Sequence, residues 1–217
     1  MRYAVLVKFF KGLAAIMLWA GLVSVVSSVS VAAQSFRILA LGDSLTAGYG
    51  LDVEDGFSRQ LERKLTTMGY SVRVLNAGVS GDTSAGGRSR LDWALADKPT
   101  HAIVELGAND GLRGLDPDAM RRNLDSIIGK LKAAGVAVLL TGMRAPPNLG
   151  RTYEAAFNRV FPELAKKHDV LFYPFFLFDV AARAALNQSD GIHPNRKGVA
   201  VIVDRIAPYV VRLLGKR

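Results

Sequence analysis

The sequence predicts an α/β fold, a three-layer α/β/α sandwich around a five-stranded parallel sheet. Five short apolar runs with the composition of β-strands alternate with longer segments in which apolar residues recur at three- and four-residue spacing. No internal repeat or low-complexity stretch interrupts this alternation. Strands separated by helices pair in parallel, because a parallel pair needs a long crossover connection, and helices then cover both faces of the sheet.

Each element has a sequence signal. The expected strands are residues 36–41, 71–76, 102–106, 136–141 and 170–173. The expected helices are about 57–68, 84–96, 117–134, 152–167 and 196–214. Asp116 followed by Pro117 is a strong helix start, because proline at the first helical position lacks only an N–H that the helix does not use. Gly69 and Gly135 are typical helix stops.

The first 33 residues predict a secretory signal peptide, and residues 34–217 then form one domain. Arg2, Lys8 and Lys11 precede an apolar stretch over residues 13–26, and small residues follow up to the expected cleavage point near Ala33. The alternative is an uncleaved membrane anchor, but about 14 apolar residues fall short of the roughly 20 that a spanning helix needs. We therefore expect an exported protein.

Composition and charge exclude several classes of function. The chain has no cysteine, which excludes disulfides, thiolate zinc sites and a cysteine nucleophile. Lysine and arginine number 28 against 19 acidic residues, a net charge of +9 that falls to +6 without the three bases of the first 33 residues. The charges are interspersed, with no arginine-rich block of the kind that binds nucleic acid. We expect no nucleic-acid partner and at most peripheral contact with an anionic membrane surface.

Four polar segments fall at the predicted working edge of the sheet. They are residues 42–45, 76–83, 107–110 and 190–194. Ligands of parallel sheets bind beyond the carboxyl ends of the strands, which is where these loops lie. Ser44 stands at a strand-to-helix turn, and such a turn exposes a hydroxyl beside free backbone N–H groups.

A serine hydroxyl needs a base before it can act as a nucleophile. Of the three histidines, His101 opens a strand and His168 closes a helix, which places both at the opposite edge. His193 lies in the loop before the last helix and is the expected base. Asp190, three residues earlier, is its expected partner, because a carboxylate on one ring nitrogen fixes the tautomer and stabilises the imidazolium.

Backbone and amide N–H groups near Ser44 complete the candidate constellation. Ser44 and Gly78 offer backbone N–H groups and Asn109 its side-chain amide for an oxyanion. Each residue alone has a plainer interpretation, as a helix cap, a tight turn, a strand-end cap or a structural histidine. The glycine-rich loop lacks the Gly-Lys-Ser/Thr of a phosphate-binding loop. Because all these residues gather at one edge, a serine hydrolase is favoured.

The four segments resemble the sequence blocks of the SGNH, or GDSL, hydrolase superfamily, over roughly residues 36–212. Residues 39–50, 76–84 and 146–150 are similar to its bacterial branch of thioesterase I/protease I/lysophospholipase L1, a group of periplasmic esterases that includes arylesterases. The resemblance implies a flavodoxin-like sheet and hydrolysis of small ester or acyl thioester substrates without a metal or cofactor. It also implies a periplasmic or secreted location.

The resemblance implies a role for each candidate residue. Ser44 would be the nucleophile, with Asp190 and His193 as the acid and base. Ser44, Gly78 and Asn109 would form the oxyanion hole.

The loop at 142–150, after the fourth strand, would hold the acyl chain through Met143, Pro146 and Leu149. Phe175 and Phe176 are further candidates for this groove, with core packing as the alternative. The stretch 178–183 departs from the branch and bears on acyl-chain preference.

Two other functions remain open, a carbohydrate esterase that removes acetyl groups and a secreted binding protein without catalysis. The sequence predicts no oligomeric state.

Overall fold

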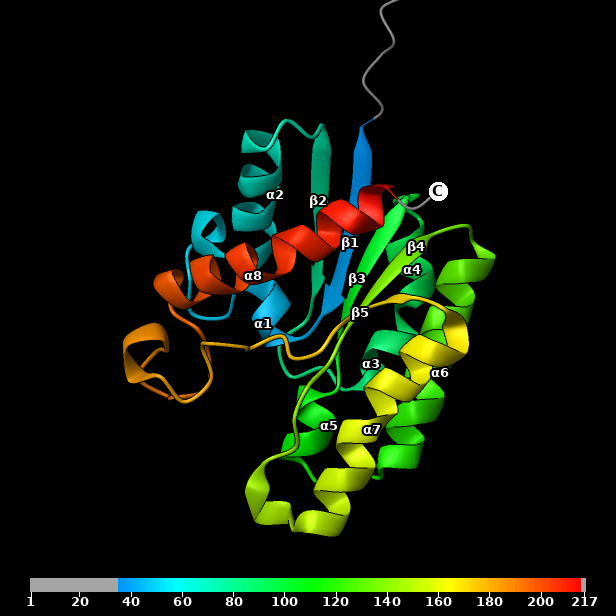
Figure 1. Ribbon diagram of the computed structural model, residues 1–217, viewed down its shortest axis with the longest axis vertical. Coiled ribbons are helices and arrows are strands. Elements are labelled where there is room, and N and C mark those ends of the chain that lie inside the picture. The colour runs from blue at the N-terminus through cyan, green and yellow to red at the C-terminus, as the bar shows by residue number, and fades with distance from the viewer. Residues whose placement is uncertain (1–34, 216–217) are drawn as a thin grey trace, which may run out of the picture. The chain divides into compact units, whose positions relative to one another are not determined.

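The computed structural model describes residues 35–215, and these form a parallel sheet with helices on both faces (Figure 1). The strands are β1 (Phe36–Gly42), β2 (Val72–Gly78), β3 (His101–Glu105), β4 (Ala137–Thr141) and β5 (Leu171–Tyr173). Their spatial order is β2-β1-β3-β4-β5 and every pairing is parallel. This is the flavodoxin-like order, with its switch point between β1 and β3. The predicted signal peptide, residues 1–33, lies outside the described residues.

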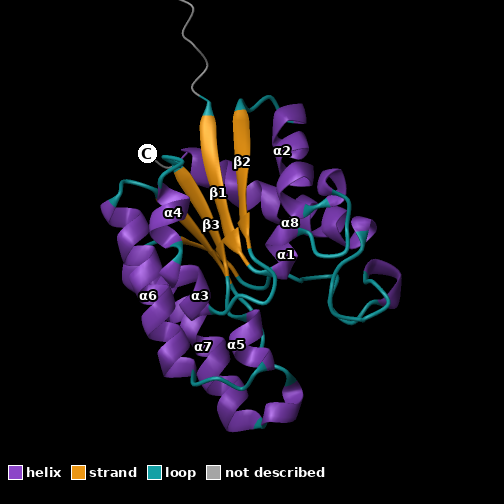
Figure 2. Ribbon diagram, turned by 180° about the vertical axis from the view of Figure 1, so that it is seen from behind, coloured by secondary structure: helices purple, strands orange, loops and turns teal. Residues whose placement is uncertain are grey.

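Helices form the outer layers of the sandwich. They are α1 (Ser44–Ala47), α2 (Phe57–Thr67), α3 (Ser84–Ser89), α4 (Leu91–Leu95), α5 (Ala108–Leu112), α6 (Pro117–Ala133), α7 (Arg151–His168) and α8 (Arg196–Gly215). Helices α2 and α8 pack together on one face of the sheet, and α6 and α7 pack together on the other (Figures 1 and 2). None of the helices described for residues 35–215 combines the length and apolar character needed to cross a membrane.

The predicted three-layer sandwich is confirmed, with shifts at element ends. β2 runs to Gly78, two residues beyond the predicted end of its strand. The helix predicted over 84–96 is two short helices, α3 and α4, that meet at Arg90. Gly86 and Gly87 weaken the helix here, and the Arg90 side chain reaches back to the carbonyls of Gly42 and Ala77.

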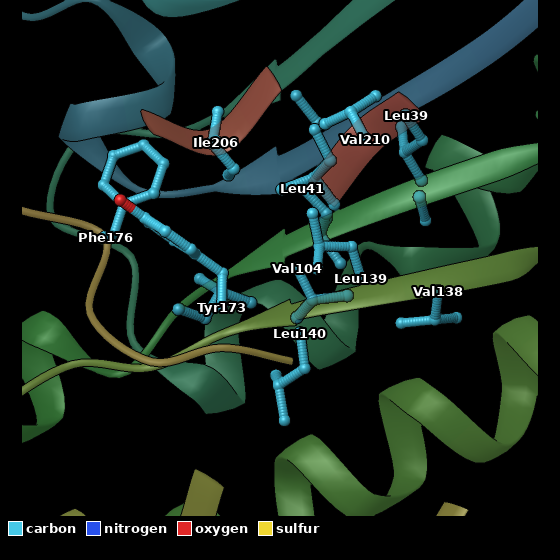
Figure 3. Packing of buried hydrophobic residues seen from close by; sticks show 14 of the residues in the cluster. Leu39, Leu41, Val104, Val138, Leu139, Leu140, Tyr173, Phe176, Ile206 and Val210 are labelled. Carbon is cyan, nitrogen blue, oxygen red and sulfur yellow. The ribbon is translucent and has the colours of Figure 1, made fainter. Parts of the chain in front are cut away.

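The core lies on both sides of β1, β3 and β4. Residues 38–41 of β1 are fully buried, as expected for a central strand covered by helices on both faces. Figure 3 shows Ile206 and Val210 extending from α8 toward side chains of the strands. Phe176 is fully buried and packs edge to face on Phe57, with ring centroids 5.1 Å apart. This packed core fixes the positions of the loops that leave the carboxyl ends of the strands.

Candidate active site

Ser44 begins α1 directly after β1. The Asp43 side chain caps this one-turn helix by accepting the Leu45 N–H at 3.0 Å. The helix ends at Gly48, whose φ of 84° is left-handed. Within residues 35–215 the Ser44 N–H has no acceptor. Ser44 is therefore held at the carboxyl edge of the sheet with a hydroxyl and an N–H both available.

Ser44, His193 and Asp190 form one hydrogen-bonded chain. His193 Nε2 lies 3.0 Å from Ser44 Oγ, and His193 Nδ1 lies 2.6 Å from Asp190 Oδ2. Asp190 Oδ1 also accepts the N–H groups of Ile192 and His193, at 2.9 and 3.0 Å. The His193 N–H, the His193 ring and the Ile192 N–H together lower the pKa of Asp190 from 3.8 to about 2. Asp190 is therefore a carboxylate at neutral pH.

The His193 loop is tied to the rest of the site by its neighbours. Gln188 donates its N–H to His193 O at 2.8 Å, and Asn187 forms an antiparallel bridge with Pro194. The Gln188 amide donates to Tyr49 O at 2.7 Å, across to the segment that follows α1. The Tyr49 ring packs on the His193 ring at 4.6 Å. The sequence predicted no role for Tyr49, although the residue lies in the segment 39–50 that resembles the bacterial branch.

The other two histidines lie where the sequence places them. His101 is the first residue of β3, and His168 is the last residue of α7. His168 Nε2 lies 2.6 Å from Asp125 Oδ1 on the neighbouring helix α6. Neither histidine lines the cavity above Ser44.

A cavity of about 550 Å³ opens above Ser44, Asn109 and His193. Its walls are mostly apolar, as is typical of a site for small ligands. The apolar lining includes Leu45, Leu112, Met143, Pro146, Phe175 and Ile192.

Of the predicted acyl contacts, Met143 and Pro146 line this cavity, but Leu149 does not and lies beside Gly114 instead. Of the two aromatic candidates, Phe175 lines the cavity, whereas Phe176 is in the core.

The structure does not bring Gly78 to the cavity. Because β2 is longer than predicted, Gly78 pairs with Gly42 in the sheet, and its N–H donates to Asn76 Oδ1 at 3.0 Å. The loop turns at Gly81, which lines the cavity, has a φ of 82° and has an N–H without an acceptor in the described part of the chain. The sequence signal for this glycine was its place in the turn after the strand, where a positive φ is needed.

Asn109 lies on the cavity wall in the first turn of α5. Its amide nitrogen donates to Asp43 Oδ2 at 3.1 Å and to the carbonyl of Asp82 at 3.0 Å. The next residue, Asp110, accepts the Ser84 N–H at 2.8 Å and the Ser84 hydroxyl at 2.6 Å. The loops after β1, β2 and β3 are thereby joined through buried polar side chains.

Two carboxyl groups near Ser44, those of Asp43 and Glu105, are fully buried, and the sequence predicted no role for either. Burial, offset in part by the Leu45 N–H, raises the pKa of Asp43 to about 6. Burial, and then the charge of Asp43, raises the pKa of Glu105 well above its usual range. An acidic residue at the end of an otherwise apolar strand was the available signal for Glu105.

A flavodoxin-like sandwich with these loops at its carboxyl edge is the architecture of an SGNH-type α/β hydrolase. A model of the GDSL-like Lipase/Acylhydrolase family matches residues 40–201, and the chain belongs to this family. It is a GDSL-type hydrolytic enzyme, an esterase.

Two bacterial enzymes and an esterase of known crystal structure are similar to this chain. Esterase TesA of Pseudomonas aeruginosa is 42% identical over 82% of this chain and 89% of its own. Thioesterase 1/protease 1/lysophospholipase L1 of Escherichia coli is 41% identical over 84% of this chain and 87% of its own. The crystal structure of AlinE4, an SGNH-hydrolase family esterase, is 48% identical over 83% of this chain and 97% of its own, with a TM-score of 0.70.

Proposed function

We propose that the chain hydrolyses carboxylic esters, acyl thioesters and lysophospholipids through an acyl-enzyme intermediate on Ser44. The observation that carries this proposal is the unbroken hydrogen-bonded chain from Ser44 Oγ through His193 to Asp190, at 3.0 and 2.6 Å. A nucleophile, a base and an orienting acid at these distances are what acyl transfer requires.

Ser44, His193 and Asp190 all act in the acylation step, and His193 acts again in deacylation. His193 Nε2 takes the Ser44 proton as Oγ attacks the acyl carbonyl. Asp190, ionised because its pKa is about 2, stabilises the imidazolium. His193 then gives the proton to the leaving alcohol or thiol, and the acyl group stays on Ser44. His193 deprotonates a water molecule that attacks the acyl-enzyme, and it then returns the proton to Ser44 Oγ as the carboxylic acid leaves.

The oxyanion would be held by the N–H of Ser44, the N–H of Gly81 and one hydrogen of the Asn109 amide, the one that without substrate bonds to Asp82 O. Gly81 takes the role expected of Gly78, because it lines the cavity and its N–H has no acceptor in residues 35–215. Loss of one such donor typically lowers turnover by ~10²–10³.

The apolar cavity supports an acyl substrate. Its volume of about 550 Å³ accommodates a small organic ligand, and Met143 and Pro146 supply apolar contacts. Esterase, thioesterase and lysophospholipase activities occur in the names of the similar proteins. We also propose that residues 1–33 act as a cleaved signal peptide, so that the enzyme works in the periplasm or outside the cell.

The experiment compares wild type with Ser44→Ala on nitrophenyl esters of increasing acyl length, acyl-CoA, lysophospholipid and acetylated sugars. Ser89→Ala is the control, because Ser89 is an exposed serine on α3. We expect hydrolysis by wild type and the control, none by Ser44→Ala, and an acyl adduct on the Ser44 peptide by mass spectrometry. Equal activity of Ser44→Ala would refute the mechanism. A preference for acetylated sugars would instead support a carbohydrate esterase, and no hydrolysis at all a binding protein.

A further inference from the structure

Glu105, the last residue of β3, is fully buried with only one of its oxygens satisfied. Oε2 accepts the Thr46 hydroxyl at 2.8 Å and the Asp43 N–H at 3.3 Å. Oε1 is buried as well, and no group in residues 35–215 donates to it. An ionised oxygen without a donor in the interior is strongly unfavourable, whereas a protonated oxygen becomes a donor itself.

The group beside Glu105 that can accept such a hydrogen bond is the Asp43 carboxylate. Glu105 pairs with Gly42 across β1 and β3, which places Asp43 next to it. Burial, and then the charge of Asp43, raises the pKa of Glu105. Two adjacent buried carboxyl groups cannot both ionise, so they share one proton. That proton belongs to Glu105, because Asp43 already accepts two other hydrogen bonds and Glu105 Oε1 accepts none.

The two hydrogen bonds that Asp43 accepts come from both sides of the proposed oxyanion hole. Oδ1 accepts the Leu45 N–H, which fixes the first turn of α1 just after Ser44. Oδ2 accepts one hydrogen of the Asn109 amide. The carboxylate of Asp43 therefore sets the positions of two of the three proposed oxyanion donors.

We propose that un-ionised Glu105 is a positioning residue, which donates from Oε1–H to Asp43 and so aligns the Asn109 amide and the Ser44 N–H for the oxyanion. The inference rests on the proposed function, because it assigns the carboxyl pair to that oxyanion hole. If Glu105 were ionised, the second charge would push Asp43 away from both groups that it holds.

Two variants separate this role from a requirement for packing or for a negative charge. In Glu105→Gln the amide NH₂ replaces Oε1–H as donor to Asp43, and the amide oxygen still accepts from Thr46. Glu105→Leu keeps a similar volume but removes both the donor and the acceptor. A neutral glutamine therefore substitutes for a neutral glutamic acid, but not for a glutamate anion.

The experiment measures kcat and KM of the full chain on a short nitrophenyl ester for wild type, both Glu105 variants and Ser44→Ala. We expect Glu105→Leu to lower kcat by ~10², with KM changed by less than about threefold, because donors displaced by about 1 Å lose that much catalysis. We expect Glu105→Gln to rescue kcat to within about threefold of wild type. Infrared spectra at neutral pH should show a buried un-ionised carboxylic acid in wild type that Glu105→Gln lacks.

Each outcome decides between the two proposals. Normal kcat in Glu105→Leu, or a loss in Glu105→Gln equal to that in Glu105→Leu, overturns the positioning role. So does the absence of the carboxylic acid band in wild type, a readout that stands even if Glu105→Leu fails to fold. Activity retained by Ser44→Ala would instead overturn the proposed function, whatever the Glu105 variants do.

Discussion

Gly78→Ala should disable the enzyme through packing, although Gly78 is absent from the cavity wall. An added Cβ at this position would lie 2.2 Å from the backbone N of Ala47 and 2.7 Å from its Cα. Ordinary contact begins near 3.4 Å, so α1 and the end of β2 must separate by about 1 Å. β2 is an edge strand, but its pairing with β1 over seven residues resists the movement, and α1 is only one turn long. The shift therefore falls mainly on α1, which carries Ser44.

The expected loss follows from that displacement. A misplacement of about 1 Å in a reacting group lowers kcat/KM by ~10², and overpacking of a core lowers the free energy of unfolding by about 1–3 kcal/mol. The assay is ester hydrolysis together with urea unfolding of the same preparation. Gly129→Ala is the matched control, because its added Cβ meets only His168 Cε1 at 3.9 Å in the middle of α6. That variant should keep full activity and gain about 0.5–1 kcal/mol in stability. Wild-type activity and stability in Gly78→Ala would refute the close approach of β2 and α1.

Three further changes have defined outcomes. Asp190→Asn should lower kcat by ~10⁴ through loss of the His193 tautomer. Because the pKa of Asp190 is lowered to about 2, its contribution to the free energy of unfolding is complete above pH 3.8 and lost as the pH falls toward 2, so the urea curves of wild type and variant should converge there. Met143→Ala should raise kcat/KM for long acyl chains relative to short ones by about tenfold in a nitrophenyl ester series. Arg90→Met breaks a half-buried ion pair with Asp82 and should lower the free energy of unfolding by about 3 kcal/mol in urea.

The sequence alone was sufficient to predict the strands and helices whose signals lie within their own residues. The strand at 36–41 and the helix at 117–134 were predicted from hydrophobic periodicity and end signals, and the structure has β1 and α6 there. Ser44, Asp190 and His193 were brought to one edge by a topological rule, that loops after parallel strands meet, and the structure joins them by hydrogen bonds.

Features that depend on contacts between distant segments were not predictable in the same way. The helix expected over 84–96 is interrupted at Arg90, whose side chain bonds to carbonyls 13 and 48 residues away in the chain. Gly78 and Gly81 differ by only three positions in one glycine-rich loop. Which of them faces the cavity depends on where β2 stops pairing with β1, a tertiary contact that the local pattern does not encode.

The polar groups behind Ser44 explain how such short loops hold an active site. Helices α1 and α5 have only four and five residues, and helices this short have little stability of their own. Their positions are instead fixed by hydrogen bonds in which Asp43 is the common acceptor, linking Leu45 on α1 with Asn109 on α5. A donor already held in place needs no reorganisation when charge develops on the substrate, which is the condition for strong electrostatic catalysis. For this reason a carboxyl group that never touches substrate can control kcat, and one shared proton can decide whether the donors are aligned.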